Sequence, residues 1–131
     1  MQGEHIPKIC TTYFAKIGQL PDSIVPISIC GRVPDWYHGA QFKVLAPKWW
    51  FFQEWKKNHD NAFYLKHFDA EVLGPLDAAD IVRRLVELSG GKDMALVCYE
   101  KPGDFCHRHH VAEWLTENGF PTSEWVKEVS R

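Results

Sequence analysis

Residues 94–110 read MALVCYEKPGDFCHRHH, an apolar run that enters a polar loop and then a segment rich in histidine. The apolar run Met94–Cys98 is short and continuous, which is typical of a strand buried on both faces of a parallel sheet. Parallel strands need crossover connections, and these are usually helices. The segment therefore predicts an α/β fold, with Cys98 at the carboxyl end of a strand.

Two further strands are predicted earlier in the chain, over Ile9–Ala15 and Ile24–Cys30, because both runs are rich in β-branched and aromatic residues. Pro26 lies inside the second run. Since proline cannot donate to a strand ladder, we expect it at the start of the strand or at a sheet edge. Ligands of open α/β sheets bind outside the carboxyl ends of the strands. If the strands are parallel, Cys30–Arg32 and Cys98 lie at the same edge.

Helices are predicted between and after the strands from apolar spacing and from helix-breaking residues. Asp77 is interpreted as one N-cap, and Asp104 as the cap of the last helix. Residues 124–129 are compatible with either a strand or a helical turn. The expected fold is a single domain over residues 1–131, a small three-layer α/β domain whose parallel or mixed sheet of about three to five strands is covered by helices. The predicted helices are Trp49–Lys57, Ala62–Leu73, Ala78–Leu88 and 104–118.

The composition is that of a globular protein without a strong charge. The chain has 131 residues, is 45% hydrophobic and has a formal net charge of −2, so no overall positive field gathers nucleic acid. No apolar run reaches the roughly 18 residues of a membrane helix, and we expect no membrane partner. The four cysteines are sparse, unlike a secreted disulfide framework. We therefore predict reduced thiols and a cytoplasmic protein.

The junction between the predicted strand and the last helix carries groups that suit nucleophilic or phosphate chemistry. Backbone N–H groups at a helix start bind anions, and Arg108 in the first turn adds a charged fork. A thiol at a helix start beside histidines has a lowered pKa. On a helical wheel His107 falls on the buried face, Arg108 and His110 lie on its flanks, and His109 points to solvent.

A second group of candidates lies between Arg32 and Lys57, where cations alternate with aromatic residues. That pattern is typical of proteins that hold single-stranded nucleic acid or a nucleotide. Trp36 and Tyr37 lie in a loop and are the preferred stacking residues. Trp50 falls on the polar side of its helix, so it either stacks on a ligand or packs against another helix. Four aromatic residues share one broad helix face and are interpreted as core: Trp49, Phe51, Phe52 and Trp55.

The run CYEKPGDFCHRHHVAEWL resembles the bacterial and phage family known as domain of unknown function 488. The run ISICGRVPDWYHGAQFKVLAPKWWFF is similar to a subgroup of that family, and the resemblance covers most of the chain. It implies an α/β domain with two cysteines and a Cys-His-Arg triplet, and it supplies no established activity. The resemblance also implies that many relatives carry an Asp-x-Arg segment at the end of an early strand. The corresponding residues 27–32 of this chain contain no Asp. The matching positions are Cys98, Cys106, His107 and Arg108.

Three functional hypotheses follow. The first is an enzyme-like domain that binds a phosphate-bearing small molecule or nucleotide, with Cys98 or Cys106 as nucleophile and His107 as acid or base. Its predicted ligand-binding residues are Arg108, Arg32, Trp36, Tyr37, Lys43 and Lys48.

The second hypothesis is a nucleic-acid-binding or interaction module without catalysis. The third is a metal-binding domain that uses Cys98, Cys106 and His110, the last two being one helical turn apart. The CxxC spacing of strong zinc sites is missing, so we predict no tightly bound metal, and we expect no cofactor. The aromatic residues suit either a core or a dimer face.

Overall fold

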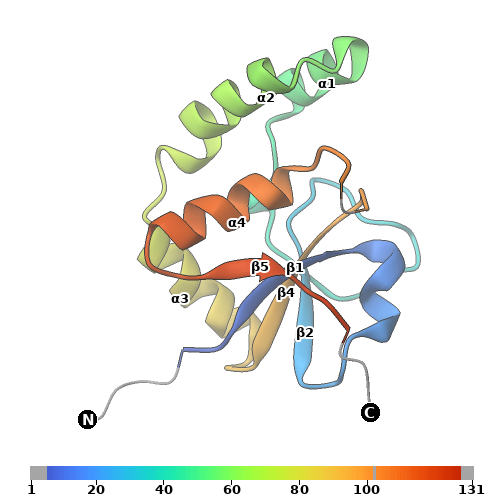
Figure 1. The fold of residues 1–131 in the computed structure, drawn as a ribbon, viewed down its shortest axis with the longest axis vertical. Coiled ribbons are helices and arrows are strands. Elements are labelled where there is room, and N and C mark those ends of the chain that lie inside the picture. The colour runs from blue at the N-terminus through green and yellow to red at the C-terminus, as the bar shows by residue number, and fades with distance from the viewer. Residues whose placement is uncertain (1–5, 102, 128–131) are drawn as a thin grey trace.

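The computed structural model describes residues 6–101 and 103–127, which fold around one parallel sheet (Figure 1). Every pairing of neighbouring strands is parallel. The predicted α/β fold with a helix-covered sheet is therefore confirmed. Across the sheet the strands are β3 (Ala40–Gln41), β2 (Ile24–Ser28), β4 (Asp93–Cys98), β1 (Ile9–Tyr13) and β5 (Thr122–Glu124).

Strand β4 occupies the centre of the sheet, as its apolar run predicts. All residues of Met94–Cys98 are buried, because β4 has a strand on each side and cover over both faces. The register pairs Val97 with Ser28 of β2 and Cys98 with Tyr13 of β1. These strands therefore end together. The segments that follow β2 and β4 leave the same edge of the sheet, which confirms that expectation.

Pro26 lies within β2 instead of at its start, opposite Ala95 of β4. Strand β3 pairs with β2 only at Ile27 and Ser28, so β2 is an edge strand where Pro26 stands. The Tyr37 hydroxyl lies 3.2 Å from the Pro26 carbonyl oxygen. Because no strand of the described residues pairs with β2 on that side of Pro26, the missing N–H of proline removes no ladder hydrogen bond there.

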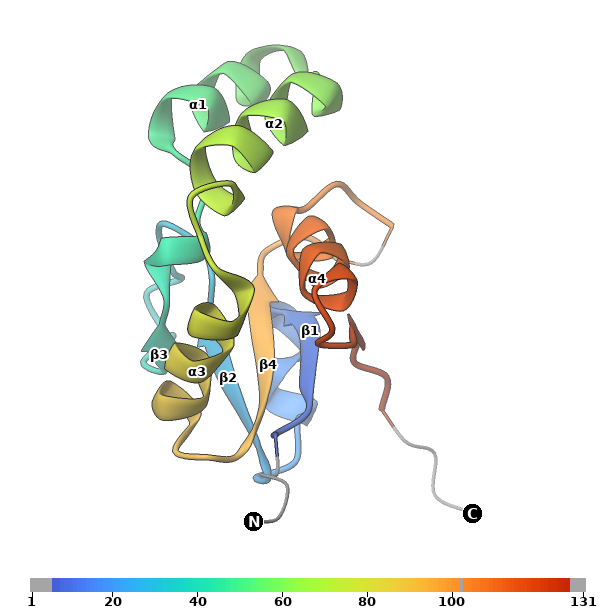
Figure 2. The same cartoon turned by 90° about the vertical axis from the view of Figure 1, so that its left-hand side faces the viewer.

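Helices α3 (Ala78–Ser89) and α4 (His107–Glu117) cover one face of the sheet (Figure 2). Helix α3 has the predicted ends. The Asp77 carboxylate accepts from the Asp80 N–H, and Gly90 follows the helix with a φ of +67°, which favours glycine. On the opposite face, the 3-10 helix η1 (Phe14–Gln19) and the loop after β2 complete three layers.

Helix α4 begins later than predicted, and its N-cap is Cys106 instead of Asp104. The Asp104 N–H closes a turn onto the Lys101 carbonyl, and the chain stays non-helical until Cys106, whose φ is −155°. Of residues 124–129, for which strand and helical turn were both open, only Glu124 lies in a strand, and residues 125–127 are neither strand nor helix. Strand β5 ends at Glu124, while residues 128 and 129 lie outside the described part of the chain.

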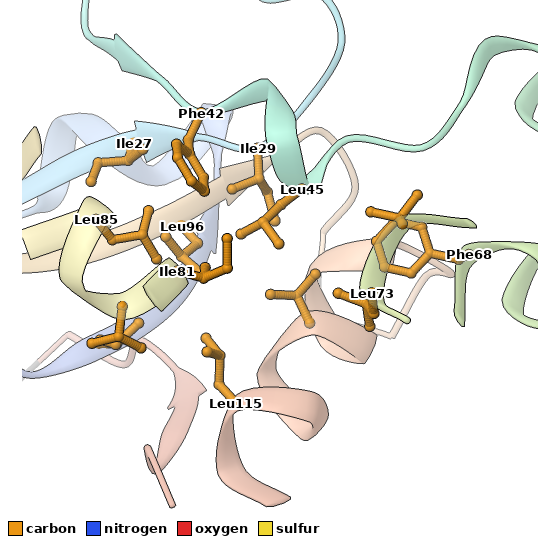
Figure 3. Packing of buried hydrophobic residues seen from close by; sticks show 14 of the residues in the cluster. Ile27, Ile29, Phe42, Leu45, Phe68, Leu73, Ile81, Leu85, Leu96 and Leu115 are labelled. Atoms are coloured by element: carbon orange, nitrogen blue, oxygen red, sulfur yellow. The ribbon is translucent and has the colours of Figure 1, made fainter. Parts of the chain in front are cut away.

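The main core fills the space between the sheet, α3 and α4 (Figure 3). Leu96 of β4 meets Ile81 and Leu85 of α3 and Leu115 of α4, and all four side chains are completely buried. The core continues towards the carboxyl ends of the strands through Leu45, Leu73 and Phe68. Through these residues the core also anchors the two helices that lie beyond the carboxyl ends of the strands.

Helices α1 (Trp49–Asn58) and α2 (Asn61–Phe68) pair with each other beyond the carboxyl ends of the strands (Figures 1 and 2). The π turn η3 (Asp69–Leu73) continues α2, so the predicted helical segment 62–73 is helical throughout. A short 3-10 helix, η2 (Lys43–Leu45), precedes α1. None of the helices within residues 6–101 and 103–127 is long and apolar enough to cross a membrane.

Candidate functional site

A cavity of about 770 Å³ lies between α1, α2 and the carboxyl ends of β2 and β4. We call it the cysteine cleft. Its lining combines thiols and an imidazole with aromatic walls and a few charged groups. The lining residues are Cys30, Gly31, Arg32, Pro47, Trp49, Phe52, Trp55, Lys56, Tyr64, Cys98, Tyr99, Glu100, Phe105, Cys106 and His107.

A Cys–His pair lies at the floor of the cleft. The hydrogen bonds of the imidazole show which of its ring nitrogens carries the proton. Cys98 ends β4 and His107 begins α4, and the Cys98 Sγ lies 3.6 Å from the His107 Nδ1. The His107 Nε2 lies 2.7 Å from the Ile29 carbonyl oxygen. A carbonyl oxygen can only accept, so Nε2 carries the proton. The Nδ1 lone pair therefore faces the sulfur.

His107 is neutral at pH 7. Burial lowers its pKa to about 4, and the charge of Arg108 acts in the same direction, while the Ile29 carbonyl opposes the shift. A neutral imidazole with a free Nδ1 lone pair can take a proton from a neighbouring thiol. Cysteine nucleophiles are activated in this way when the base is held in position by a third group, which here is the Ile29 carbonyl.

The structure joins Cys98 and Cys106 in a disulfide across eight residues of sequence. The prediction that all four cysteines are reduced is therefore wrong for this pair, although Cys10 and Cys30 are free thiols. The reason is the path of the loop, which returns the N-cap of α4 to the end of β4. The disulfide thus lies at the cleft floor, beside His107.

Cys30 is a third sulfur in the same place, and sequence reasoning gave it no role. Its side chain is buried, and burial raises the pKa of the thiol to about 12, with the charge of Glu100 adding to the effect. The Cys30 Sγ, the Cys98 Sγ and a ring nitrogen of His107 all lie within 4.8 Å of one another. The sequence feature that points to Cys30 as a site residue is its position at the end of a predicted strand.

Arg108 lies outside the cleft lining, and its charge is already paired with a carboxylate of the protein. Its side chain is completely buried, and Nε and Nη2 donate to the Glu124 carboxylate at 3.1 and 3.0 Å. Nη1 donates to the Glu100 carbonyl, and the guanidinium lies over the Tyr13 ring. A helical wheel places Arg108 on a flank of α4, but it cannot show that β5 brings Glu124 to that flank.

The other predicted ligand-binding residues are divided between the cleft and the rest of the surface. Arg32 lines the cleft. Lys43 and Lys48 are exposed outside its lining. Trp36 packs edge-on against Phe14, and Tyr37 is buried on the η1 face, where its hydroxyl lies 2.6 Å from the Ala40 carbonyl oxygen.

The aromatic walls come from residues that the helical wheel interpreted as core. That interpretation is correct for Phe51, which is completely buried, and wrong for Trp49, which is 72% exposed. Phe52 and Trp55 are partly buried, pack against the core cluster and line the cleft on their other side, as Trp49 does. Helix α1 packs chiefly against α2, so its apolar face is divided between the core and the cleft. Trp50 donates to the Glu71 carboxylate at 2.9 Å and packs on α2.

The metal hypothesis of the sequence used His110, which the structure places elsewhere. The His110 Nε2 lies 2.5 Å from the Asp69 carboxylate, and its Nδ1 lies 3.5 Å from Glu113. The set of Cys98, Cys106 and His110 is therefore not assembled. His109 is half-buried instead of pointing freely to solvent, and burial lowers its pKa.

One comparison with known proteins matches. The family model described as the active DUF488-N3 subclade matches residues 17–119, which include the whole cysteine cleft lining. The chain matches no curated protein and no solved structure.

Proposed function

Because the chain belongs to the active DUF488-N3 subclade, we propose that it is a thiol-dependent enzyme acting on a phosphate-bearing small molecule, most simply a nucleotide, in the cysteine cleft. The observation that carries the proposal is the 3.6 Å approach of the Cys98 Sγ to the His107 Nδ1 at the floor of that cleft. The description of the subclade as active supports catalysis over binding alone.

The lining of the cleft supports the ligand class. A planar ring can stack on an aromatic side chain, and the exposed Trp49 ring lines the cleft, whereas Trp55 and Phe105 already stack on each other. Arg32 and Lys56 are the cations of the lining and would hold the phosphate. In this proposal they replace Arg108, whose guanidinium is paired with Glu124. The role of Arg108 is then to support the loop that carries Glu100.

The proposed chemistry is nucleophilic substitution. The Cys98 S–H gives its proton to the His107 Nδ1, and the sulfur attacks an electrophilic atom of the ligand. A bond from sulfur to that atom forms, the bond to the leaving group breaks, and His107 returns the proton to the leaving group. Water then releases the product from sulfur. Cys98 must be a thiol to begin this sequence, so we propose that the protein works in the reducing cytoplasm.

Alkylation of the reduced protein with iodoacetamide, in the presence of a chelator, tests the proposal. We expect Cys98 to react, His107→Gln to slow that reaction at neutral pH, and a nucleoside monophosphate to protect Cys98. Ribose 5-phosphate and inorganic phosphate separate the contributions of the ring and the anion. Cys10→Ser is the matched control, because Cys10 lies on β1 outside the cleft lining and should not change the profile.

Two results would contradict this function. If Cys98 of the folded, reduced protein does not react, the nucleophile is wrong. If a single-stranded oligonucleotide binds while no mononucleotide protects Cys98, the nucleic-acid-binding alternative replaces the enzyme.

A further inference from the structure

We propose that the reduced protein binds a zinc ion through the Cys30 Sγ, the Cys98 Sγ and the His107 Nδ1. The three residues come from the ends of β2 and β4 and the start of α4, and their two sulfurs and a ring nitrogen of His107 lie within 4.8 Å of one another. The inference depends on the ligand geometry and not on a substrate, although it uses the Cys98 and His107 of the proposed enzyme. It also departs from the sequence-based expectation of no tightly bound metal, since these residues meet only in the fold.

The spacing of the ligand atoms agrees with a tetrahedral zinc site. Bonds of about 2.3 Å to sulfur and about 2.05 Å to nitrogen, at the tetrahedral angle, place a sulfur and a nitrogen ligand about 3.6 Å apart. The Cys98 Sγ and the His107 Nδ1 are 3.6 Å apart while Cys98 is still joined to Cys106, so reduction alone would present both ligand atoms at this spacing. Two thiolates and one imidazole with an open fourth position form a ligand set known from zinc enzymes.

The groups around the ligands have the arrangement expected of a metal site. A metal-bound histidine usually donates its other ring N–H to a carboxylate or a backbone carbonyl. The His107 Nε2 is bonded in this way to the Ile29 carbonyl oxygen, at 2.7 Å, which turns the Nδ1 lone pair towards the sulfurs. The Cys30 N–H donates to the Ser28 hydroxyl at 3.2 Å and so restrains the strand end that carries the second sulfur.

Burial and charge favour a divalent cation over an empty thiolate site. The side chains of Cys30, Cys98 and His107 are 6%, 2% and 5% exposed. Two thiolates in this position would be buried anions side by side, which is costly. A divalent ion neutralises both, and the imidazole adds no charge. All three residues line the cysteine cleft, which provides a route of entry.

The disulfide makes this site dependent on redox state. When Cys98 and Cys106 are joined, the Cys98 sulfur is no longer a thiolate ligand, and only Cys30 and His107 remain. Oxidation transfers two electrons from the Cys98 and Cys106 thiolates to a small-molecule disulfide: the Cys98–Cys106 bond forms, the bond of the small molecule breaks to give two thiolates that take up protons from water, and the zinc ion is released. Zinc on Cys98 also blocks the proposed nucleophile, so a bound ion holds the enzyme inactive.

The test is titration of the reduced, tag-free protein with Zn²⁺ alone, repeated with Co²⁺ as a spectroscopic probe. We expect one ion per chain and thiolate-to-cobalt charge-transfer absorption. Cys30→Ser should weaken binding at least about 10-fold, as loss of a ligand requires. Cys10→Ser, a free cysteine outside the cleft lining, should bind like the unmodified chain. Circular dichroism of each apo variant confirms that it is folded.

A redox experiment on the unmodified sequence covers the case in which Cys30→Ser fails to fold. Oxidation with a small-molecule disulfide should abolish Zn²⁺ binding, and Cys106→Ser, which cannot form the disulfide, should keep it. Binding that is unchanged by Cys30→Ser, or that survives oxidation, would overturn the metal site. The alkylation experiment is done with a chelator, so its outcome bears only on the proposed enzyme.

Discussion

Arg108 of α4 and Glu124 of β5 form a two-pronged ion pair, with the guanidinium Nε and Nη2 at 3.1 and 3.0 Å from the carboxylate oxygens. The arginine is completely buried, whereas the Glu124 side chain is 24% exposed. The Thr11 hydroxyl donates to the same carboxylate at 2.7 Å. This cluster connects the last helix to the edge of the sheet, and it accounts for a cation in the first turn of α4, where the helix dipole is unfavourable.

Replacement of Arg108 should therefore reduce stability before it affects any ligand. From position and residue type alone, the sequence favours an anion-binding arginine whose loss leaves the melting temperature unchanged, and the burial of Arg108 reverses that expectation. We predict that Arg108→Ala lowers the free energy of unfolding by about 3 kcal/mol, because Glu124 loses its partner. Urea denaturation measures the loss.

The matched control is Arg83→Ala, which removes an arginine from an exposed pair with Asp80 and should leave the denaturation midpoint nearly unchanged. Arg108→Ala combined with Glu124→Ala should cost less than the sum of the single changes. An unchanged midpoint for Arg108→Ala would show that the pair is not formed in solution.

Reduction of the Cys98–Cys106 disulfide should destabilise the metal-free protein. The cross-link spans eight residues, and a loop of that size restricts the unfolded chain by about 2–3 kcal/mol. With a chelator present, the melting temperature of the unmodified chain should fall when a reductant is added. Cys106→Ser should melt at the same temperature with and without reductant. Cys10→Ser should retain the full effect, and its loss there would mean that another thiol is responsible.

Two exposed tryptophans distinguish ligand binding from surface packing. Trp49 is 72% exposed and lines the cysteine cleft, whereas Trp36 is 57% exposed and lies outside its lining. If the proposed nucleotide stacks in the cleft, Trp49→Ala should weaken its binding about 10-fold, within the usual range for one stacked base. Trp36→Ala should leave the affinity unchanged. Isothermal titration calorimetry on both variants decides, and equal losses would argue against stacking on Trp49.

The Trp50–Glu71 contact should give the protein a pH-dependent stability. The hydrogen bond from the Trp50 indole lowers the pKa of Glu71, and His67 contributes in the same direction. A carboxyl group with a lowered folded pKa adds stability above its unfolded pKa of about 4.3, and that stability is lost as the pH falls through the folded value.

Glu71→Gln keeps an oxygen acceptor for Trp50 and removes the charge. The variant should therefore melt below the unmodified chain at pH 6, and the difference should close as the pH falls towards about 3. Melting temperatures of the two proteins across this range measure it. A difference that is independent of pH would assign the effect to packing of α1 on α2 instead of to charge.

Local patterns in the sequence were sufficient for the architecture and for part of the site. The continuous apolar run Met94–Cys98 specifies a strand buried on both faces, and such a strand requires parallel neighbours and covering helices. Asp77 and Gly90 mark the ends of α3 because capping depends on residues a few positions apart. His107 could be assigned to the buried face of α4 for the same reason, since helical period is a local property.

Only the tertiary structure determined which groups meet across long separations in sequence. Cys30 joins Cys98 and His107 because β2 and β4 end together, and Arg108 meets Glu124 because β5 returns to the edge of the sheet. Trp49 lines a cleft instead of a core because α1 packs on α2 beyond the strand ends. Apolar spacing shows that a face is covered, but the partner that covers it is chosen by the packing of the whole chain.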